Sequence, residues 1–308
     1  MYSPSPPRIC FSAVLAALKY YANGDFGYQA DLDTLANAMR SIRLFLAAII
    51  AAGLAGAEPP AAPARKKILA IGQSKGFQHD STSDGLATIW KIGKETGLWD
   101  TYIRTDTELI TKKKLGANAK NLDYFDAIFF YTSGELDLDD EQKQALLDFV
   151  RTGGKGFMAA HSGVDTLYSW PEYGELVGGY FDLHPWNQFE AKIVNEDPEH
   201  PATAHFPPDF FLFDEIYQLK NYSRDRVRVL MRLDAEGVDL AKEGVHRTDR
   251  DFAVSWVRNY GKGRVFVSTL GHRSEVWEMP QVQKMWLEAA KWVTGLTEGG
   301  DATPRPLR

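Results

Sequence analysis

The chain has 308 residues, a formal net charge of −6 at pH 7 and a hydrophobic content of 44%. This length can form one large domain or two small ones, with a core that needs no covalent cross-link. The acidic balance, without a strip of lysine and arginine, argues against a nucleic-acid partner. The single cysteine, Cys10, excludes an intramolecular disulfide and a multi-cysteine metal site.

The N-terminal 57 residues are predicted to lie outside the folded domain. Residues 39–57 have the three parts of a secretory signal peptide: a basic start at Met39–Arg43, an apolar run and a small-residue cleavage site at Ala55–Ala57. We expect translation to begin at Met39, which makes residues 1–38 an upstream extension, and export to the periplasm or the medium. The apolar run is too short to stay in a membrane, so no anchor is expected after cleavage. The alternative is an N-terminal helix that docks on the domain.

The domain is predicted to begin with a strand, a helix and a second strand. Lys67–Gly72 is an apolar run typical of a buried parallel strand. A helix is expected next, with Ser81 or Ser83 as its N-cap and Gly97 at its end. Residues 99–104 alternate between apolar and polar side chains, which predicts a second strand.

A further strand and helix lead to the central strand of the chain. Residues 124–131 are strongly apolar and predict a buried strand. The following helix has the clearest start signal in the sequence, because Asp139 and Gln142 have the spacing of a capping box. Gly153-Gly154 ends this helix, and the chain enters the strand Gly156–Ala160. Strands that alternate with helices predict right-handed crossovers and a parallel sheet.

A histidine follows that central strand directly. His161 lies among small residues, and Gly163 allows a positive φ or a close backbone approach. In open α/β sheets, ligands bind beyond the carboxyl ends of the strands. We therefore predict that His161 belongs to a functional site, with Asp165 on the outgoing turn to orient it. The alternative is a histidine that only stabilises the turn.

The second half of the chain is predicted to add aromatic loops and more strands. Residues 168–186 are rich in aromatic residues and glycine, and these rings either pack in the core or stack on sugar faces. His200, in a proline-bounded turn, is expected to be structural. Further elements are expected as strands at 189–194, 226–233, 251–257 and 263–270, and as a helix at 285–292. We expect the domain to span residues 66–296, between an Ala/Pro-rich linker at 58–65 and a flexible tail at 297–308.

Three histidines are predicted at strand exits. His79 follows the first strand, His161 a central strand and His272 the last, and parallel strands would bring their side chains to one end of the sheet. Separate turn-stabilising histidines, or a buried hydrogen-bond network, are the alternatives. Because His184 lies in the aromatic segment and Glu215 in an Asp-Glu pair, we favour a functional site.

The chemistry available to these side chains is limited. Neither a phosphate-binding loop nor a Gly-x-Gly-x-x-Gly turn follows the first strand, which argues against a nucleotide-dependent enzyme. Proton transfer by histidine and glutamate remains, or a divalent metal that acts as a Lewis acid. Imidazole and carboxylate ligands suit zinc, manganese or iron. The candidate ligands are His79, His161, His184, Glu215 and His272.

Five pieces of the sequence together resemble a known family. In chain order they are Gly76-Phe77-x-His79, Ala159-Ala160-His161-Ser162-Gly163-x-Asp165, Gly178-Gly179-x-Phe181-x-x-His184-Pro185, Asp214-Glu215-x-Tyr217 and Gly261-x-Gly263-Arg264-Val265-Phe266 with Leu270-Gly271-His272. The chain thereby resembles the ThuA-like (trehalose utilisation) proteins of the class I glutamine amidotransferase-like superfamily. The resemblance implies an α/β fold, a flavodoxin-like three-layer sandwich with a mostly parallel central sheet.

The resemblance also implies an activity. His161 occupies the place where amidotransferases keep their nucleophilic cysteine, so glutaminase activity is not expected. The family context is disaccharide catabolism through 3-keto-glycosides, which implies proton transfer beside a ketone, leading to isomerisation, elimination or hydrolysis. On this interpretation His161, Glu215 and Asp165 are catalytic, and a small carbohydrate contacts His79, His184, Trp186, Tyr217 and His272. The alternative is a periplasmic carbohydrate-binding or accessory protein without catalysis.

The predicted signal peptide is testable on the exported protein. We expect N-terminal sequencing of the mature chain to begin at Glu58, because cleavage is predicted after Ala57. A mature protein that retains residues before Met39 would contradict both the predicted start and the predicted cleavage.

Overall fold

The structure, a computed structural model, describes Arg40 and residues 64–307. The predicted upstream extension and signal peptide lie outside this range, Arg40 apart. Residues from Ala64 to the C-terminus fold as a unit of their own. Of the helices in the described residues, none combines the length and the apolar character needed to cross a membrane.

A nine-stranded sheet forms the centre of this unit, with the strand order β2-β1-β3-β4-β11-β10-β9-β6-β7. A second, two-stranded sheet pairs β5 with β8. The strands are β1 (Lys66–Ile71), β2 (Trp99–Arg104), β3 (Ala127–Phe130), β4 (Gly156–Ala160), β5 (Tyr180–Leu183), β6 (Gln188–Asn195), β7 (Asp209–Glu215), β8 (Gln218–Lys220), β9 (Arg228–Leu233), β10 (Ala253–Tyr260) and β11 (Gly263–Ser268).

The directions of the strands decide which loops meet. β2, β1, β3, β4 and β11 pair in parallel, as the alternation of strands and helices predicts. The strands beyond β11 pair antiparallel, so β10 and β6 run against the others, while β9 and β7 run with them. The carboxyl ends of β1, β4, β11 and β7 therefore point to the same end of the sheet.

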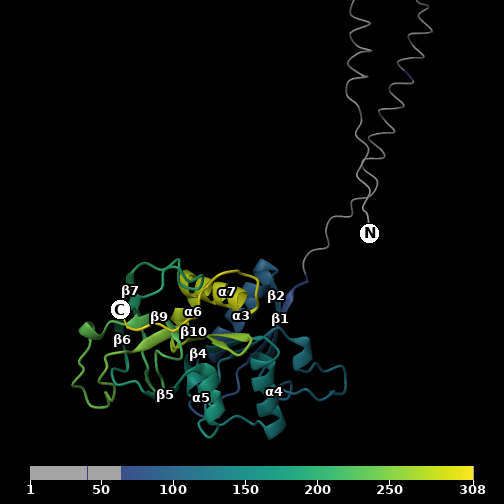
Figure 1. Cartoon of the computed structure of the whole chain (residues 1–308), viewed down its shortest axis with the longest axis horizontal. Coiled ribbons are helices and arrows are strands. Elements are labelled where there is room, and N and C mark those ends of the chain that lie inside the picture. Colours follow the sequence, from purple (N-terminus) through teal and green to yellow (C-terminus); the bar gives the residue numbers. More distant parts are fainter. Residues whose placement is uncertain (1–39, 41–63, 308) are drawn as a thin grey trace, which may run out of the picture. The chain divides into compact units, whose positions relative to one another are not determined.

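Helices cover both faces of the sheet (Figure 1). On one face lie α3 (Thr82–Thr96), α6 (Ser274–Glu278) and α7 (Pro280–Val293), which contact one another. On the other face lie α4 (Asp140–Arg151) and α5 (Pro171–Val177). Short 3-10 turns are η1 (Leu122–Tyr124), η2 (His161–Val164) and η3 (Ala235–Gly237). The predicted flavodoxin-like three-layer α/β sandwich is confirmed.

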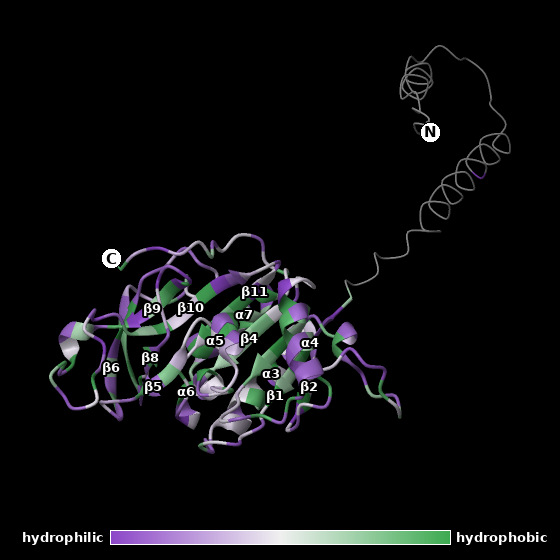
Figure 2. Cartoon of the chain, turned by 60° about the horizontal axis from the view of Figure 1, so that its bottom comes forward, coloured by the Kyte–Doolittle hydropathy of each residue, from purple (hydrophilic) through white to green (hydrophobic). Residues whose placement is uncertain are grey.

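Each inner strand divides its side chains between two buried clusters. In β1, Ile68 and Ala70 face the cluster that includes α3 and α7, whereas Leu69 and Ile71 face the cluster that includes α4 and α5. The sheet is accordingly hydrophobic along its inner strands (Figure 2). Burial on both faces explains why these strands are continuous apolar runs in the sequence.

Two predicted helix ends are confirmed. Asp139 accepts a hydrogen bond from the backbone N–H of Gln142, whose side chain accepts one from the N–H of Asp139, which completes a capping box on α4. Gly97 ends α3 in the left-handed conformation, with its N–H donated to the carbonyl of Gly93.

The N-cap position of α3 is at a predicted residue, but the predicted capping bond is not formed. Ser81 occupies the N-cap position, but its hydroxyl makes no capping bond. It pairs instead with the Tyr131 hydroxyl and donates to the carbonyl of Gly271. Ser83 donates to the carbonyl of Asp80. Ser81 therefore ties the loop after β1 to the loop after β11, which helps to build the end of the sheet where the histidines lie.

The C-terminal segment differs from the predicted flexible tail. Ala302 is buried, Asp301 pairs with Arg228, and Arg305 pairs with Asp197. Arg228 also donates to Asp197, whose side chain is only 2% exposed. A buried carboxylate needs cationic partners, and this requirement explains why residues 301–305 lie against the domain.

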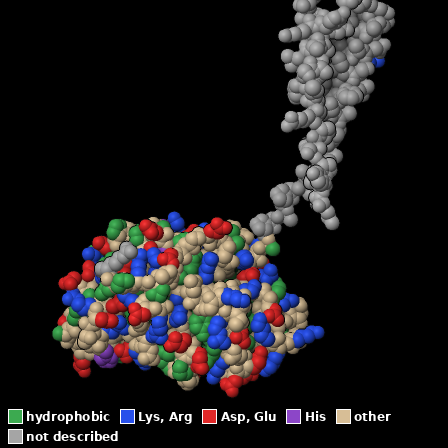
Figure 3. Space-filling model, in the orientation of Figure 1, with side chains coloured by type: hydrophobic (Ala, Val, Ile, Leu, Met, Phe, Trp, Pro, Cys, Tyr) green, Lys and Arg blue, Asp and Glu red, His purple; other side chains and the backbone are tan. Residues whose placement is uncertain are grey.

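The visible surface mixes both signs of charge. On the face in Figure 3, Lys and Arg side chains are interspersed with Asp and Glu. The expectation that nucleic acid is not a partner stays a prediction.

A buried ion cluster stabilises the antiparallel half of the sheet. Arg224 pairs with Glu196 and Asp251 at 2.8 Å each, and all three side chains are less than a tenth exposed. Arg232 adds a second cation to Glu196. Removing one partner of such a cluster leaves a buried charge without compensation.

We therefore expect Arg224→Met to destabilise the fold by about 3–5 kcal/mol, because two buried carboxylates lose their shared cation. Urea unfolding of the purified protein measures this change. Arg250→Met is the matched control, since its pair with Glu236 is largely exposed and is expected to contribute less than about 1 kcal/mol. Equal effects of the two variants would contradict the buried cluster.

Candidate active site

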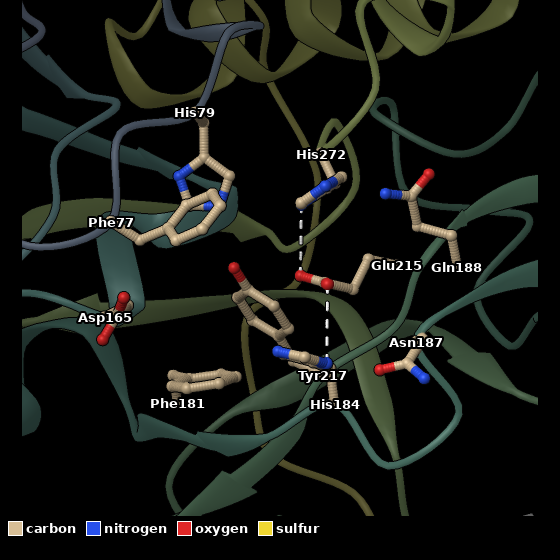
Figure 4. A pocket seen from close by; sticks show the side chains of 10 residues that line it. All are labelled: Phe77, His79, Asp165, Phe181, His184, Asn187, Gln188, Glu215, Tyr217 and His272. Atoms are coloured by element: carbon tan, nitrogen blue, oxygen red, sulfur yellow. Dashed lines mark ion pairs between the residues drawn. The ribbon is translucent and has the colours of Figure 1, made fainter.

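A cavity of about 570 Å³ lies at the end of the sheet where β1, β4, β7 and β11 finish. Figure 4 shows its side chains, with Glu215 between His272 and His184. The cavity is lined by Phe77, His79, Asp165, Phe181, His184, Asn187, Gln188, Glu215, Tyr217 and His272. Its residues thus come from loops that are distant in the sequence.

His161 has an unusual backbone conformation. It follows β4 directly and has a φ of 43°, in the left-handed region that non-glycine residues rarely adopt. Such a conformation costs about 1–3 kcal/mol and persists only where the surroundings enforce it. Gly163, where a positive φ was one predicted possibility, instead allows a close approach: an added Cβ would lie 3.0 Å from the Cβ of Ala159.

The imidazole of His161 is fully buried and has a defined tautomer. Its Nδ1 lies 2.7 Å from the carbonyl oxygen of Thr269, which can only accept, so Nδ1 carries the proton. The other nitrogen, Nε2, then has a lone pair and lies 2.7 Å from the Tyr217 hydroxyl, which donates to it. Asp165 makes no such contact. The prediction that Asp165 orients His161 is wrong, because its carboxylate accepts a hydrogen bond from Tyr168 instead.

Glu215 lies between two histidines. Its Oε2 is 3.2 Å from Nδ1 of His272, and its Oε1 is 3.5 Å from Nδ1 of His184. The carboxylate is 8% exposed, whereas the His184 side chain is 41% exposed and faces the cavity. One oxygen of Glu215 therefore faces His161 and His272, and the other faces the more exposed His184.

Asp214, the neighbour of Glu215, holds the loop after β11. Its carboxylate accepts hydrogen bonds from the N–H groups of Gly271 at 2.7 Å and Arg273 at 3.3 Å. Burial raises the pKa of Asp214 to about 6. These bonds fix the residues on either side of His272, and so they fix the position of His272 relative to Glu215.

The environment gives the histidines different proton affinities. Burial, assisted by the nearby His272, lowers the pKa of His79 to about 4. Burial also lowers the pKa of His161 well below its ordinary value. The hydrogen bond to Glu215 raises the pKa of His272. Groups with separated proton affinities around one cavity are typical of a catalytic or ligand-binding site.

The domain matches the model of a known protein family. The family model described as ThuA, trehalose utilisation, matches residues 67–293. The chain belongs to the ThuA family. This family is part of the glutamine amidotransferase-like superfamily. A search of curated proteins found no match.

Solved structures of ThuA-like proteins have the same fold. One from Bacteroides uniformis is 20% identical, with a TM-score of 0.64 over 80% of this chain and 98% of the other. Another, from Parabacteroides merdae, is 16% identical, with a TM-score of 0.58 over 79% of this chain and 98% of the other. At these identities the likeness concerns the fold alone.

Most of the residues predicted for the ThuA site lie together. His79, His184, Glu215, Tyr217, His272 and Asp165 line the cavity, and His161 lies behind it in contact with Tyr217 and His272. Trp186 lies elsewhere. Its ring packs on Phe252 in the core and its N–H donates to the carbonyl of Asp239, so it does not line the cavity as predicted for a sugar contact.

Four residues that line the cavity were not predicted as site residues. Phe77 and Phe181 belong to the sequence pieces that resemble the family, whereas Asn187 and Gln188 belong to none of these pieces. Asn187 has a φ of 54°, a conformation that asparagine tolerates better than most residues. The residue type at position 187 therefore indicates a turn, but it does not indicate the direction in which the Asn187 amide points.

A Gly-x-Ser-x-Gly sequence follows β1 at Gly72–Gly76. Such a sequence is typical of the nucleophile turn in serine hydrolases. Ser74 is half-buried, does not line the cavity and has no hydrogen bond to a histidine among the described residues. The geometry therefore gives no support to a serine nucleophile.

The His272–Glu215 pair makes a pH prediction. In the metal-free protein we expect Glu215→Gln to lower the pKa of His272, because the hydrogen bond to Glu215 is the main cause of its increase. A raised folded-state pKa stabilises the fold while the imidazole is protonated, and this stabilisation disappears as the pH rises through that pKa. Histidine NMR titration in the presence of a chelator measures the change.

Asp182→Asn is the control for this titration, since Asp182 pairs with His246 and not with His272. We expect it to leave the His272 titration unchanged. A His272 pKa that is the same in the wild type and in Glu215→Gln would contradict the pairing.

Proposed function

We propose that the protein is an enzyme of carbohydrate catabolism that moves the proton on a carbon next to a ketone, with a 3-keto-glycoside or related keto-sugar as substrate. The observation that carries this proposal is the convergence of His79, His184, Glu215 and His272 on one cavity. A protein that only binds a sugar needs hydroxyl and amide partners, and gains little from four ionisable groups that line one cavity.

The cavity suits a sugar in size and in chemistry. Its volume of about 570 Å³ is in the range of small-molecule sites. Phe77 is 63% exposed and offers an aromatic face on which a sugar ring can stack. On the other side, Asn187 and Gln188 provide amides that can bind hydroxyl groups. These contacts support a carbohydrate as the ligand.

His184 is the best-placed residue to carry the proton. It is the most exposed histidine of the cavity, and Glu215 Oε1 lies 3.5 Å from its Nδ1. At this distance the negative charge of Glu215 can offset the positive charge that forms on the ring when the other nitrogen takes a proton. The fully buried His161, predicted from the sequence as the central acid or base, is better suited to hold its neighbours in place.

The proposed reaction begins at the carbon beside the ketone. The base removes the hydrogen on the carbon beside the ketone, the C–H electron pair forms a C=C bond, and the ketone oxygen takes the negative charge. Return of the proton to the former carbonyl carbon, with transfer of the hydroxyl proton, gives the isomeric ketone. Transfer of the proton to a glycosidic oxygen that leaves from the next carbon gives elimination. At the His272 end of the cavity, an imidazole N–H can donate a hydrogen bond to the oxyanion.

Export is part of this proposal. A signal peptide at residues 39–57 would deliver the enzyme to the periplasm or the medium, where disaccharides are present. This location rests on the sequence pattern alone.

The proposed reaction is testable by deuterium exchange. We expect the protein in D₂O to exchange the hydrogen beside the ketone of a 3-keto-disaccharide, or to convert the sugar, as followed by proton NMR. His184→Asn is expected to slow this exchange by roughly 100-fold or more, the typical contribution of a general base. His246→Asn removes an exposed histidine that does not line the cavity and is expected to leave the rate unchanged.

Sugar binding without exchange or turnover would contradict an enzyme and support a carbohydrate-binding role. An unchanged rate in His184→Asn would contradict the role of His184.

A further inference from the structure

Four side chains with metal-binding atoms converge at the wall of the cavity. One such atom from each of His79, His161, Glu215 and His272 lies within 4.8 Å of the other three. His79, His161 and His272 follow β1, β4 and β11, and Glu215 is the last residue of β7, so no short sequence pattern unites them. We propose that these four residues together bind one divalent transition-metal ion.

The distances among three of these atoms fit a small metal ion. His161 Nε2 lies 3.3 Å from His272 Nδ1 and 3.7 Å from Glu215 Oε2, and the last two atoms are 3.2 Å apart. Ligand atoms that surround a tetrahedral zinc ion at about 2.0–2.1 Å lie about 3.3 Å from one another. The three atoms thus already have the separations that a shared ion requires.

The orientation of His161 fits the role of a ligand. Its Nδ1–H donates to the carbonyl of Thr269, so the lone pair of Nε2 points toward His272 and Glu215. Histidines that bind metals commonly donate their second N–H to a carbonyl or carboxylate in this way, which fixes the ring and its tautomer. The buried bond to Thr269 is therefore an outer partner of the site.

Two further observations concern the lone pairs that His79 and His161 would offer to a metal. The His79 ring contacts the rings of His161 and His272 edge to face, but it hydrogen-bonds to none of the described residues. The Tyr217 hydroxyl donates to Nε2 of His161 and is the competitor that a metal must displace. Because Tyr217→Phe removes this competitor, we expect the variant to keep the metal and to bind it at least as tightly as the wild type.

The charge of the site also favours a cation. None of the ten residues that line the cavity is Lys or Arg, and within the described part of the chain the ion-pair partners of Glu215 are the imidazoles of His161, His184 and His272. Three nitrogens and one carboxylate suit zinc, iron(II) or manganese(II), whereas calcium and magnesium prefer oxygen ligands. His79, Glu215 and His272 line the cavity, so the ion would be accessible to a ligand there.

A metal at this place would act as a Lewis acid on a ketone oxygen. This link to catalysis rests on the proposed function, but the binding of the metal does not. His184 and Asp165, which also line the cavity, would stay available for proton transfer.

The test uses the full chain without an affinity tag. The protein is stripped with a chelator and titrated separately with Zn²⁺, Mn²⁺ and, without oxygen, Fe²⁺ by calorimetry, and bound metal is counted by elemental analysis after gel filtration. We expect one equivalent per chain for at least one of these ions. Glu215→Gln and His272→Gln are expected to weaken binding by roughly 100-fold or more, because each removes a ligand.

Three further variants complete the design. His161→Ala is expected to lose the metal as well, with circular dichroism and a cooperative melt to show that it folds. His246→Ala, which removes an exposed histidine outside the cavity, is expected to bind the metal like the wild type, and Tyr217→Phe is expected to bind it at least as tightly. No bound metal in the wild type, or wild-type affinity in Glu215→Gln and His272→Gln, would overturn the site.

The two proposals fail in different ways. Metal binding without deuterium exchange on keto-sugars would overturn the proposed function and keep the metal site. Exchange at the full rate by chelated protein would keep the proposed function and overturn the role of the metal in it.

Discussion

The hydrogen bond from His161 Nδ1 to the carbonyl of Thr269 is the interaction on which the site depends. At 2.7 Å and fully buried, it joins the exits of β4 and β11, which are neighbours in the parallel sheet. It stabilises His161 in a backbone conformation that most residues avoid, and it fixes the tautomer of the ring. As a result, the Nε2 lone pair is directed at Tyr217, His272 and Glu215 instead of at the backbone.

The parallel half of the fold was predictable because its strands are buried on both faces. Runs such as Ile68–Ile71 and Phe157–Ala160 are apolar without interruption, and the capping box at Asp139 marks the helix between two of them. The antiparallel half of the fold was less predictable from the sequence. Strands were expected at β6, β9 and β10 but not at β7, and neither their order nor their direction follows from periodicity, since long-range pairing depends on tertiary packing.

The site was predictable where a strand exit determines the position of a side chain. His79, His161 and His272 follow parallel strands, so the topology alone brings them to one end of the sheet. Local sequence did not decide the rest. Asp165 is near His161 in the chain but bonds to Tyr168, and Trp186 is aromatic like a sugar contact but packs in the core. A side chain that leaves a loop can point in several directions, and only the packed fold selects one.

The central claim is that four strand exits build one metal-binding catalytic site, and anomalous X-ray scattering tests it most directly. Crystals of the protein equilibrated with zinc would be measured on both sides of the zinc absorption edge. The account predicts one strong peak about 2.0–2.2 Å from the nitrogens of His79, His161 and His272 and from an oxygen of Glu215. A map without a peak there, or with zinc only at exposed histidines such as His246, would contradict it.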